Sequence, residues 1–349
     1  MYDICNKMTS PSHVTSKPIR VAFFHRKPRA LGNFSIETYF QQIREHLPAT
    51  FLPVYVEMPF ESNGLWRRLA NTLYAFLKQE DINHITGDIH YIAAFLRKRK
   101  TVLTIHDCGS LHETTGIKHK IMKFFWFSMP VAKSAIITAN SAATKADIQY
   151  QTGCKASKIS VVYICVGQHF KSQPKPFNTQ NPRILQIGTA PNKNLERLIT
   201  ALKNIPCTLV IVGRVSGHIK QLLSENSIQT ECIERRLTDQ EILEQYQRCD
   251  ILSLVSTLEG FGMPIVEANA VGRVAISSNT TSMPEIAGDA AVLVNPFDVA
   301  SIRAGFIKIL EDFNLRETLI ANGYINHQRF QPKNLAQQYA DIYQQLRER

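Results

Sequence analysis

Short apolar runs alternate with longer stretches of helical periodicity along the whole chain. In the first half the apolar runs lie at 19–24, 51–56, 83–86, 101–105 and 135–139. The first run is followed by a stretch, 34–46, with the apolar spacing of a helix. Strands that alternate with helices are typical of parallel α/β layers, and we expect a parallel sheet here.

A polar segment with three prolines, residues 171–182, interrupts this rhythm and predicts a linker. A second alternation follows, with strands expected at 183–187, 208–212, 251–254, 274–277 and 291–294. The architecture therefore occurs twice, which predicts one domain over residues 1–170 and another over 183–333.

A last helix is expected over 334–349, because five large side chains recur on one face: Leu335, Tyr339, Ile342, Tyr343 and Leu346. The spacing alone does not decide whether this helix packs on its own domain or on the N-terminal domain.

Length and composition set the broad class of the protein. The chain has 349 residues, of which 44% are hydrophobic, enough for two globular α/β domains. No apolar run is long enough to span a bilayer, and the first twenty residues lack the apolar core of a secretory signal. The seven cysteines are scattered and form no Cys-x-x-Cys pair, so we expect no zinc site, no disulfide framework and a cytoplasmic location.

A net charge of +11 predicts an anionic partner. No nucleic-acid-binding module is recognisable, which leaves nucleotide substrates and anionic lipid. Residues 118–127 mix cations with aromatic side chains, and residues 65–69 are a shorter version of the same pattern. Such segments suit peripheral docking at the inner face of the plasma membrane, although the aromatic residues could equally belong to the core.

The most informative chemistry lies in residues 257–267, Thr-Leu-Glu-Gly-Phe-Gly-Met-Pro-Ile-Val-Glu. Two carboxylates, Glu259 and Glu267, bracket a Gly-Phe-Gly loop that leads into a helix begun by Pro264 and ended by Gly272. Free N–H groups at a helix start favour an anion, and each ionised carboxylate can accept two hydroxyls. The pattern predicts a nucleotide-sugar site, although two solvated glutamates would give the same spacing.

Two further motifs follow predicted strands. Gly188 makes a turn after the strand at 183–187, and Lys193 stands where a long cation can reach a diphosphate held at that turn. The strand at 101–105 ends in His106 and Asp107, at the carboxyl edge where α/β sites gather. A lone lysine is often solvated, and a histidine at this place can be a base, a ligand or merely the end of a strand.

Residues 257–267 resemble the Glu-x7-Glu motif of glycosyltransferase family 4, and residues 282–291 and 294–296 resemble the same family. The similarity is specific from about Arg183 to Asp312 and looser beyond. It implies the GT-B fold: two facing Rossmann-like domains with parallel sheets, and a C-terminal helix that crosses back to the N-terminal domain.

The resemblance also implies a donor site. Glu267 would accept the ribose hydroxyls, Glu259 those of the transferred sugar, and Lys193 would contact the diphosphate. Thr189 stands where the family usually has an arginine, and Arg214 is the nearest residue that could replace that charge. Ile233 and Arg235 are weak candidates for base contact. The remaining donor residues are at the two loops themselves: Gly188, Gly260, Phe261, Gly262 and Met263.

On the acceptor side the resemblance implies that His106 orients the donor sugar, with Asp107 beside it. Gly32 and Asn33 correspond to the loop that faces the acceptor, where the family often has two adjacent glycines and this chain has one. The family mechanism is retention by front-face displacement, with no metal and no cofactor besides the nucleotide sugar. The sequence contains no Asp-x-Asp motif.

These observations predict a metal-independent, retaining hexosyltransferase. The donor would be GDP- or UDP-hexose, with mannose favoured, and the acceptor a saccharide or a lipid-linked sugar of surface polysaccharide or lipopolysaccharide. Thr189 and the single glycine support the alternative, a non-catalytic nucleotide-sugar-binding or scaffold protein that has kept the fold.

Overall fold

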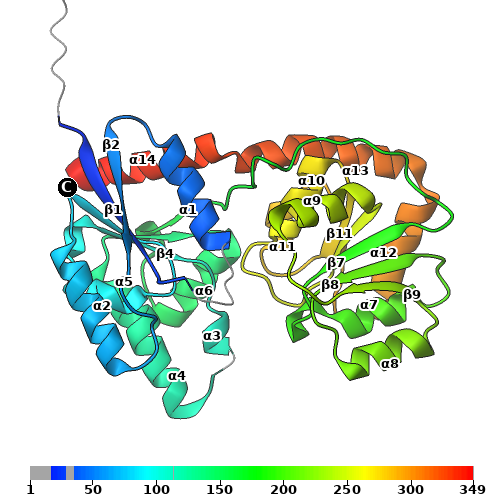
Figure 1. Cartoon of the computed structure of the whole chain (residues 1–349), viewed down its shortest axis with the longest axis horizontal. Coiled ribbons are helices and arrows are strands. Elements are labelled where there is room, and N and C mark those ends of the chain that lie inside the picture. The colour runs from blue at the N-terminus through cyan, green and yellow to red at the C-terminus, as the bar shows by residue number, and fades with distance from the viewer. Residues whose placement is uncertain (1–16, 29–34, 113, 349) are drawn as a thin grey trace, which may run out of the picture.

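The computed structural model describes residues 17–28, 35–112 and 114–348, which form two α/β halves side by side (Figure 1). The N-terminal half holds a six-stranded sheet in which every pair is parallel, in the order β2-β1-β3-β4-β5-β6. Its strands are β1 (Ile19–His25), β2 (Phe51–Glu57), β3 (Ile82–Ile85), β4 (Thr101–Ile105), β5 (Ile136–Ala139) and β6 (Ile159–Val161). Its α-helices are α1 (Ser35–His46), α2 (Leu65–Leu77), α3 (Gly109–His112), α4 (Gly116–Met122), α5 (Met129–Lys133) and α6 (Ala142–Thr152).

The C-terminal half holds a second parallel sheet, in the order β12-β11-β10-β7-β8-β9. Its strands are β7 (Arg183–Ile187), β8 (Thr208–Val212), β9 (Gln229–Ile233), β10 (Ile251–Leu254), β11 (Val274–Ser278) and β12 (Val292–Val294). The helices are α7 (Leu195–Leu202), α8 (Gly217–Glu225), α9 (Asp239–Arg248), α10 (Met263–Val271), α11 (Met283–Ala287), α12 (Val299–Glu311) and α13 (Phe313–Asn326). The order is that of the dinucleotide-binding Rossmann fold, in which the direction of winding reverses between the first and fourth strands, here β7 and β10.

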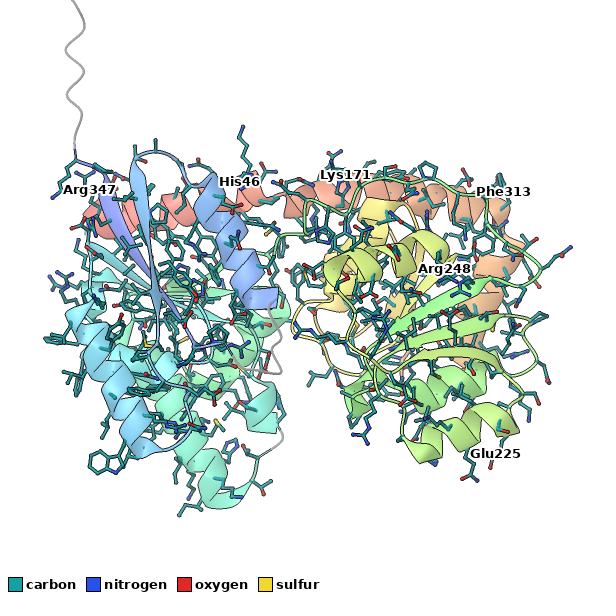
Figure 2. The ribbon with its side chains drawn as sticks, viewed as in Figure 1. His46, Lys171, Glu225, Arg248, Phe313 and Arg347 are labelled. Carbon is teal, nitrogen blue, oxygen red and sulfur yellow. The ribbon has the colours of Figure 1, made fainter. Side chains whose placement is uncertain are left out.

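The C-terminal helix α14 (Pro332–Glu348) leaves its own half and packs on the other. Its buried side chains, among them Tyr339, Tyr343 and Leu346, share one hydrophobic cluster with Phe23 of β1 and Phe40 of α1. In Figure 2, Phe313 lies at the far end of the C-terminal half, whereas Arg347 of α14 lies at the opposite end of the molecule. The predicted crossing back to the N-terminal half is therefore confirmed.

The sequence pattern gave no bounds for β6 and β9, each of which lies at one edge of its sheet. β9 reads Gln-Thr-Glu-Cys-Ile and is largely solvent-exposed, and β6 is three residues long. The other two edge strands, β2 and β12, are apolar enough to have been predicted, so the missing signal reflects the polar sequence of β9 and the short length of β6. Among the helices of the described residues, none is long and apolar enough to cross a membrane.

Candidate active site

Two loops meet where the winding of the second sheet reverses. The first follows β7 and contains Gly188 and the short helix η5 (Pro191–Lys193); the second follows β10 and contains Glu259. Lys193 Nζ lies 2.6 Å from Glu259 Oε1, and both side chains are largely buried. Ligands of open α/β sheets bind at such reversal points, so the structure brings the two predicted donor residues together at the place where the fold offers a site.

The backbone around this pair is fixed by short contacts. Gly188 has φ of +89°, and a Cβ there would lie 2.9 Å from Lys193 Cε, so the lysine side chain lies directly over the turn. Asn192 Nδ2 donates to the Leu258 carbonyl at 2.8 Å, and the Thr257 amide donates to the Asn192 carbonyl at 2.8 Å. These bonds hold the two loops in register with each other.

The Gly-Phe-Gly loop turns sharply into α10. Gly262 has φ of +109°, and Gly272, with φ of +81°, ends the helix as predicted. Pro264 is the second residue of the helix and Met263 the first, so the predicted start was wrong by one position. Phe261 is buried against the rings of Tyr163 and Phe330, which anchors the loop.

Glu267 lies one turn after the start of α10 and lines a cavity of about 610 Å³. The cavity is also lined by Ile187, Met263 and Arg236 of the C-terminal half and by Tyr39 of α1. Glu267 Oε2 accepts a hydrogen bond from Tyr246 at 2.5 Å. Burial raises the pKa of Glu267 to about 7, and the Tyr246 hydrogen bond opposes that rise.

Tyr246 was not foreseen as a partner of this carboxylate. Its spacing from Leu243 marks it as an inward-facing residue of α9, but sequence spacing does not show which side chain of α10 it meets.

His106 lies at the end of β4 with a defined protonation state. Its Nε2 lies 2.9 Å from the Thr86 carbonyl, which can only accept, so Nε2 carries the proton. Burial lowers the pKa of His106, so the ring is neutral at physiological pH. Its Nδ1 is buried and has no hydrogen-bond partner among the described residues, which leaves an acceptor available to a ligand hydroxyl.

The halves touch at the loop that carries Glu259. Ser141 Oγ and Thr144 Oγ1 donate to the Gly260 carbonyl at 2.9 and 3.1 Å. Ser141 also caps α6, accepting from the Thr144 amide at 3.0 Å. Glu285 of α11 accepts from the Ala142 amide at 2.8 and 3.0 Å, so a carboxylate of the C-terminal half caps a helix of the N-terminal half.

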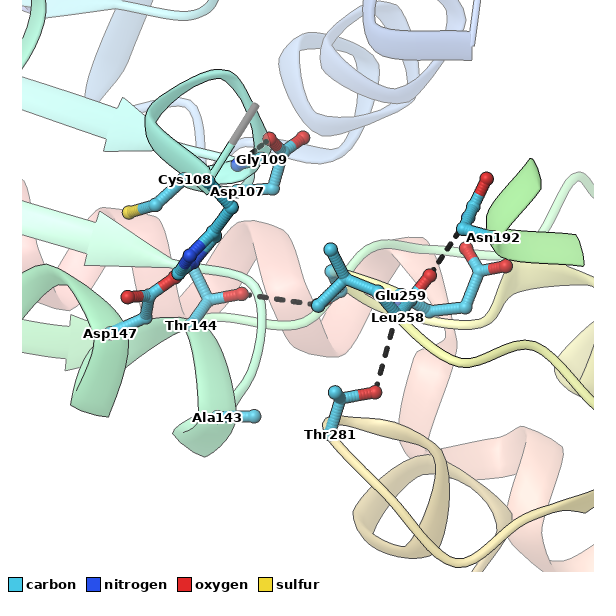
Figure 3. A pocket seen from close by; sticks show the side chains of 12 residues that line it. Asp107, Cys108, Gly109, Ala143, Thr144, Asp147, Asn192, Leu258, Glu259 and Thr281 are labelled. Atoms are coloured by element: carbon cyan, nitrogen blue, oxygen red, sulfur yellow. Dashed lines mark hydrogen bonds and ion pairs between the residues drawn. The ribbon is translucent and has the colours of Figure 1, made fainter. Parts of the chain in front are cut away.

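A second cavity, of about 450 Å³, lies between the halves beside this contact (Figure 3). Asp107 and Asp147 line it from the N-terminal half, and Asn192, Glu259 and Thr281 line it from the C-terminal half. Asp107 Oδ1 accepts from the Gly109 amide at 2.8 Å.

His112 Nε2 lies 2.8 Å from Asp147 Oδ2 on the wall of this cavity. Sequence reasoning missed this pair, because the two residues belong to helices that only the fold brings together. The cavity offers carboxylate, amide and hydroxyl groups, which are suited to sugar hydroxyls.

Two of the other predicted site residues, Arg214 and Arg235, are solvent-exposed. A Cβ on Gly213 would lie 3.0 Å from Thr189 Cγ2, so the loop of Arg214 is adjacent to Thr189, and Arg214 itself is solvent-exposed. Arg235 is exposed and pairs with Glu241 at 2.5 Å.

Gly32 and Asn33 lie outside the described residues. Within the part of the chain that is described, no cluster of three or more His, Cys, Asp or Glu side chains is arranged to hold a metal ion.

Two α/β halves with parallel sheets that face each other across a cavity form the GT-B fold. The family comparison agrees: residues 168–326 match the model of the family Glycosyl transferases group 1. Residues 168–326 of this chain are thus similar to group 1 glycosyltransferases, and the whole chain has the GT-B fold.

Several curated relatives are mannosyltransferases. The O-antigen chain mannosyltransferase B of Escherichia coli is 29% identical over 179 residues, which cover 46% of this chain and 45% of that protein. The serotype-specific mannosyltransferase WbdA of Escherichia coli is 34% identical over 235 residues, or 61% of this chain and 29% of that protein. The chain thus spans less than half the length of these relatives.

Solved structures share the fold over nearly the whole chain. Alr3699/HepE of Anabaena, solved with UDP and glucose, has a TM-score of 0.75 at 17% identity, covering 93% of this chain and 99% of that one. WaaG, a glycosyltransferase involved in lipopolysaccharide biosynthesis, has a TM-score of 0.66 at 15% identity, with coverage of 93% and 99%. At this level of identity the likeness shows the fold alone.

Proposed function

We propose that the chain is a retaining, metal-independent hexosyltransferase of the family 4 type. It would move mannose from a nucleoside diphosphate to a saccharide or lipid-linked acceptor in surface polysaccharide or lipopolysaccharide synthesis. The observation that carries the proposal is the contact between Lys193 and Glu259 at the reversal point of the donor sheet, within the cleft that faces the N-terminal half. The O-antigen and serotype-specific mannosyltransferases among the relatives favour mannose and this pathway.

In this proposal the bound donor replaces the ion pair between Lys193 and Glu259 with separate contacts to each residue. The diphosphate takes the ammonium group of Lys193, which releases Glu259 to accept two hydroxyls of the transferred sugar. Glu267, on the wall of the neighbouring cavity, accepts the ribose hydroxyls. Thr189 brings no charge to the diphosphate, and Arg214, in the adjacent loop, is the nearest guanidinium that could reach it.

The acceptor attacks from the same face that the diphosphate leaves. The bond from the acceptor oxygen to the anomeric carbon forms as the bond from that carbon to the phosphate oxygen breaks, and the acceptor proton passes to the phosphate. The neutral ring of His106 positions the donor sugar, because its unpartnered Nδ1 can accept from a sugar hydroxyl. No second carboxylate is required as a nucleophile, unlike in retaining glycosidases.

The alternative is a protein that binds a nucleotide sugar without transferring it. The absence of an arginine at Thr189 favours this alternative. The contact of Lys193 with Glu259 and the free acceptor on His106 favour the enzyme.

The test is nucleoside diphosphate release from GDP-mannose, UDP-glucose, UDP-galactose and UDP-N-acetylglucosamine, with EDTA present. We expect release from one donor that survives EDTA and falls by about a hundredfold or more in Glu259→Ala and Lys193→Ala. Lys203→Ala, an exposed lysine of the same half, is the matched control and should leave release unchanged. Thermal stabilisation by a donor, without nucleoside diphosphate release in the presence of any acceptor, would support the binding protein. If a donor caused neither stabilisation nor release, the proposed donor site would be refuted.

A further inference from the structure

Helix α2 buries its small and polar side chains and exposes its large apolar ones, the reverse of an ordinary surface helix. Its core-facing side carries Asn71, Thr72 and Ala75, and the polar groups there are satisfied by local bonds, such as Asn71 Nδ2 to the Phe60 carbonyl at 2.8 Å. Its large apolar side chains point to solvent instead, with exposed fractions of 67% for Leu65, 81% for Trp66, 45% for Leu69, 56% for Leu73, 49% for Phe76 and 70% for Leu77. At about 100° per residue these six side chains fall within an arc of about 120°.

The neighbouring segment continues this surface. Helix α4 and the π-helical turn η3 (Lys123–Ser128) expose Ile117, Ile121, Phe124 and Phe125, each by 46% or more. The two segments are in contact, because the Arg68 guanidinium of α2 lies 4.6 Å from the ring centre of Trp126 in η3. Both lie at the same end of the N-terminal half in Figure 1. These ten exposed apolar residues on α2, α4 and η3 are called the apolar face below.

The two segments that carry the apolar face hold charge of one sign. Residues 64–79 and 114–135, which carry the face, contain no Asp or Glu and seven Lys or Arg: Arg67, Arg68, Lys78, Lys118, Lys120, Lys123 and Lys133. A patch of this size and composition marks an interaction site and not ordinary solvent-facing surface. A partner must supply an apolar interior and a negative boundary.

We propose that the apolar face docks the protein onto an anionic lipid bilayer. Leucine, tryptophan and phenylalanine side chains enter the boundary between head groups and acyl chains, while the lysines and arginines meet the anionic head groups. A second copy is a poorer occupant, because a symmetric dimer through this face would set its cations against one another.

The docked orientation places one cavity near the lipid. Helix α3, whose Gly109 and His112 line the cavity between the halves, is followed after three residues by α4 of the apolar face. We expect a sugar linked to a lipid to reach that cavity from the docked position. This consequence rests on the proposed transferase function; the docking itself does not.

The test is flotation of the full chain with vesicles of phosphatidylcholine alone or mixed with phosphatidylglycerol. We expect binding to the mixed vesicles only, weakened by high salt. The variant Trp66→Ser/Leu73→Ser and the variant Ile121→Ser/Phe124→Ser should each lose about tenfold or more of the binding without loss of thermal stability, because these side chains are exposed. The matched control is Phe313→Ser/Ile325→Ser, which removes two residues of similar exposure, 63% and 67%, from the C-terminal half and should bind as the unmodified chain does.

Two results would overturn the proposal. One is no binding of the unmodified chain to the mixed vesicles, or equal loss in the control. The other is a dimer in solution without lipid that Trp66→Ser/Leu73→Ser converts to a monomer, since the face would then be covered by protein. Nucleoside diphosphate release, measured in solution without lipid or detergent, separates this outcome from a failure of the proposed function, because the apolar face contains none of the proposed donor-site residues.

Discussion

At the scale of single residues, burial changes the charge of two candidate site residues, His106 and Glu267, near neutral pH. Burial lowers the pKa of His106, which keeps its ring neutral, and raises the pKa of Glu267 to about 7. Only the ionised carboxylate can accept two ribose hydroxyls without competing as a donor. Donor binding should therefore depend on pH through Glu267.

We expect donor affinity to increase as the pH rises through about 7, because the ionised fraction of Glu267 increases. Glu267→Gln should bind the donor more weakly and with no such pH dependence. Calorimetric titration with the nucleoside diphosphate between about pH 6 and about pH 8 measures both effects. A pH-independent affinity in the unmodified chain would contradict the assigned role of Glu267.

The raised pKa of Glu267 also predicts that the protein loses stability as the pH rises. A pKa above the usual value of 4.5 means that ionisation of Glu267 costs stability, and that cost grows as the pH rises from about 4.5 through 7. Glu267→Gln keeps an acceptor for Tyr246 and should raise the free energy of unfolding above pH 7, by at most about 3 kcal/mol. Denaturant unfolding at acidic and alkaline pH should show the gain only at the alkaline end.

At the scale of elements, the loop after β10 and helix α6 carry the contact between the halves. The Gly260 backbone lies directly against the N-terminal half: a Cβ there would lie 2.7 Å from the His106 carbonyl oxygen and 3.1 Å from Asp107 Cβ. The first of these neighbours is backbone, so it cannot turn aside as a flexible side chain would. The carbonyl of the same glycine accepts from Ser141 and Thr144.

Gly260→Ala should push the halves apart while leaving the C-terminal half intact, because Gly260 does not have a positive φ. We expect transfer to fall by about tenfold or more with donor affinity nearly unchanged. Gly217→Ala is the control, since a Cβ there meets nothing within 4 Å. Equal activity of the two variants would show that this contact does not support transfer.

Glu285 makes the second contact, at the start of α6. Glu285→Ala removes the acceptor of the Ala142 amide and of the Tyr163 hydroxyl, the latter at 3.1 Å. We expect a loss of about 1–2 kcal/mol of stability, the usual cost of a lost helix cap. Small-angle scattering should show a more extended molecule than that of the unmodified chain; an unchanged profile would restrict Glu285 to a capping role.

At the scale of the whole molecule, α14 ties the end of the chain to the first sheet. Tyr343 Oη lies 2.6 Å from His84 Nδ1, and His84 Nε2 lies 2.7 Å from Thr104 Oγ1, all within the buried core of the N-terminal half. The stability of that half therefore depends on residues more than two hundred positions away in the sequence.

Tyr343→Phe should leave the His84 nitrogen without its partner and destabilise the N-terminal half by about 1–3 kcal/mol. The two tryptophans, Trp66 and Trp126, both lie in that half, so intrinsic fluorescence during urea unfolding reports it directly. Tyr150→Phe, at a hydroxyl on an 84% exposed side chain, is the control and should unfold at the same urea concentration as the unmodified chain.

The sequence by itself determined the features that depend on neighbours along the chain. Strands β4, β8 and β10 have the predicted bounds, because each is a short, mostly apolar run that is buried along its whole length. His106 was predicted at the cleft because it follows such a strand, and parallel strands end at one edge of their sheet. Lys193 and Glu259 were predicted from the glycine-containing loops that carry them and from the family resemblance of those loops.

The tertiary structure alone decided the features that depend on contacts between distant segments. Sequence spacing could not show that Tyr246 bonds Glu267, that Glu285 caps α6, or that His112 meets Asp147, since each pair joins separate elements. It also could not show the orientation of α2: the shorter basic-aromatic pattern at 65–69 turned out to be the more exposed one, while Phe127 of the longer segment is buried. Periodicity shows that a helix has an apolar face, but only the packing of the helix shows whether that face meets the core or the solvent.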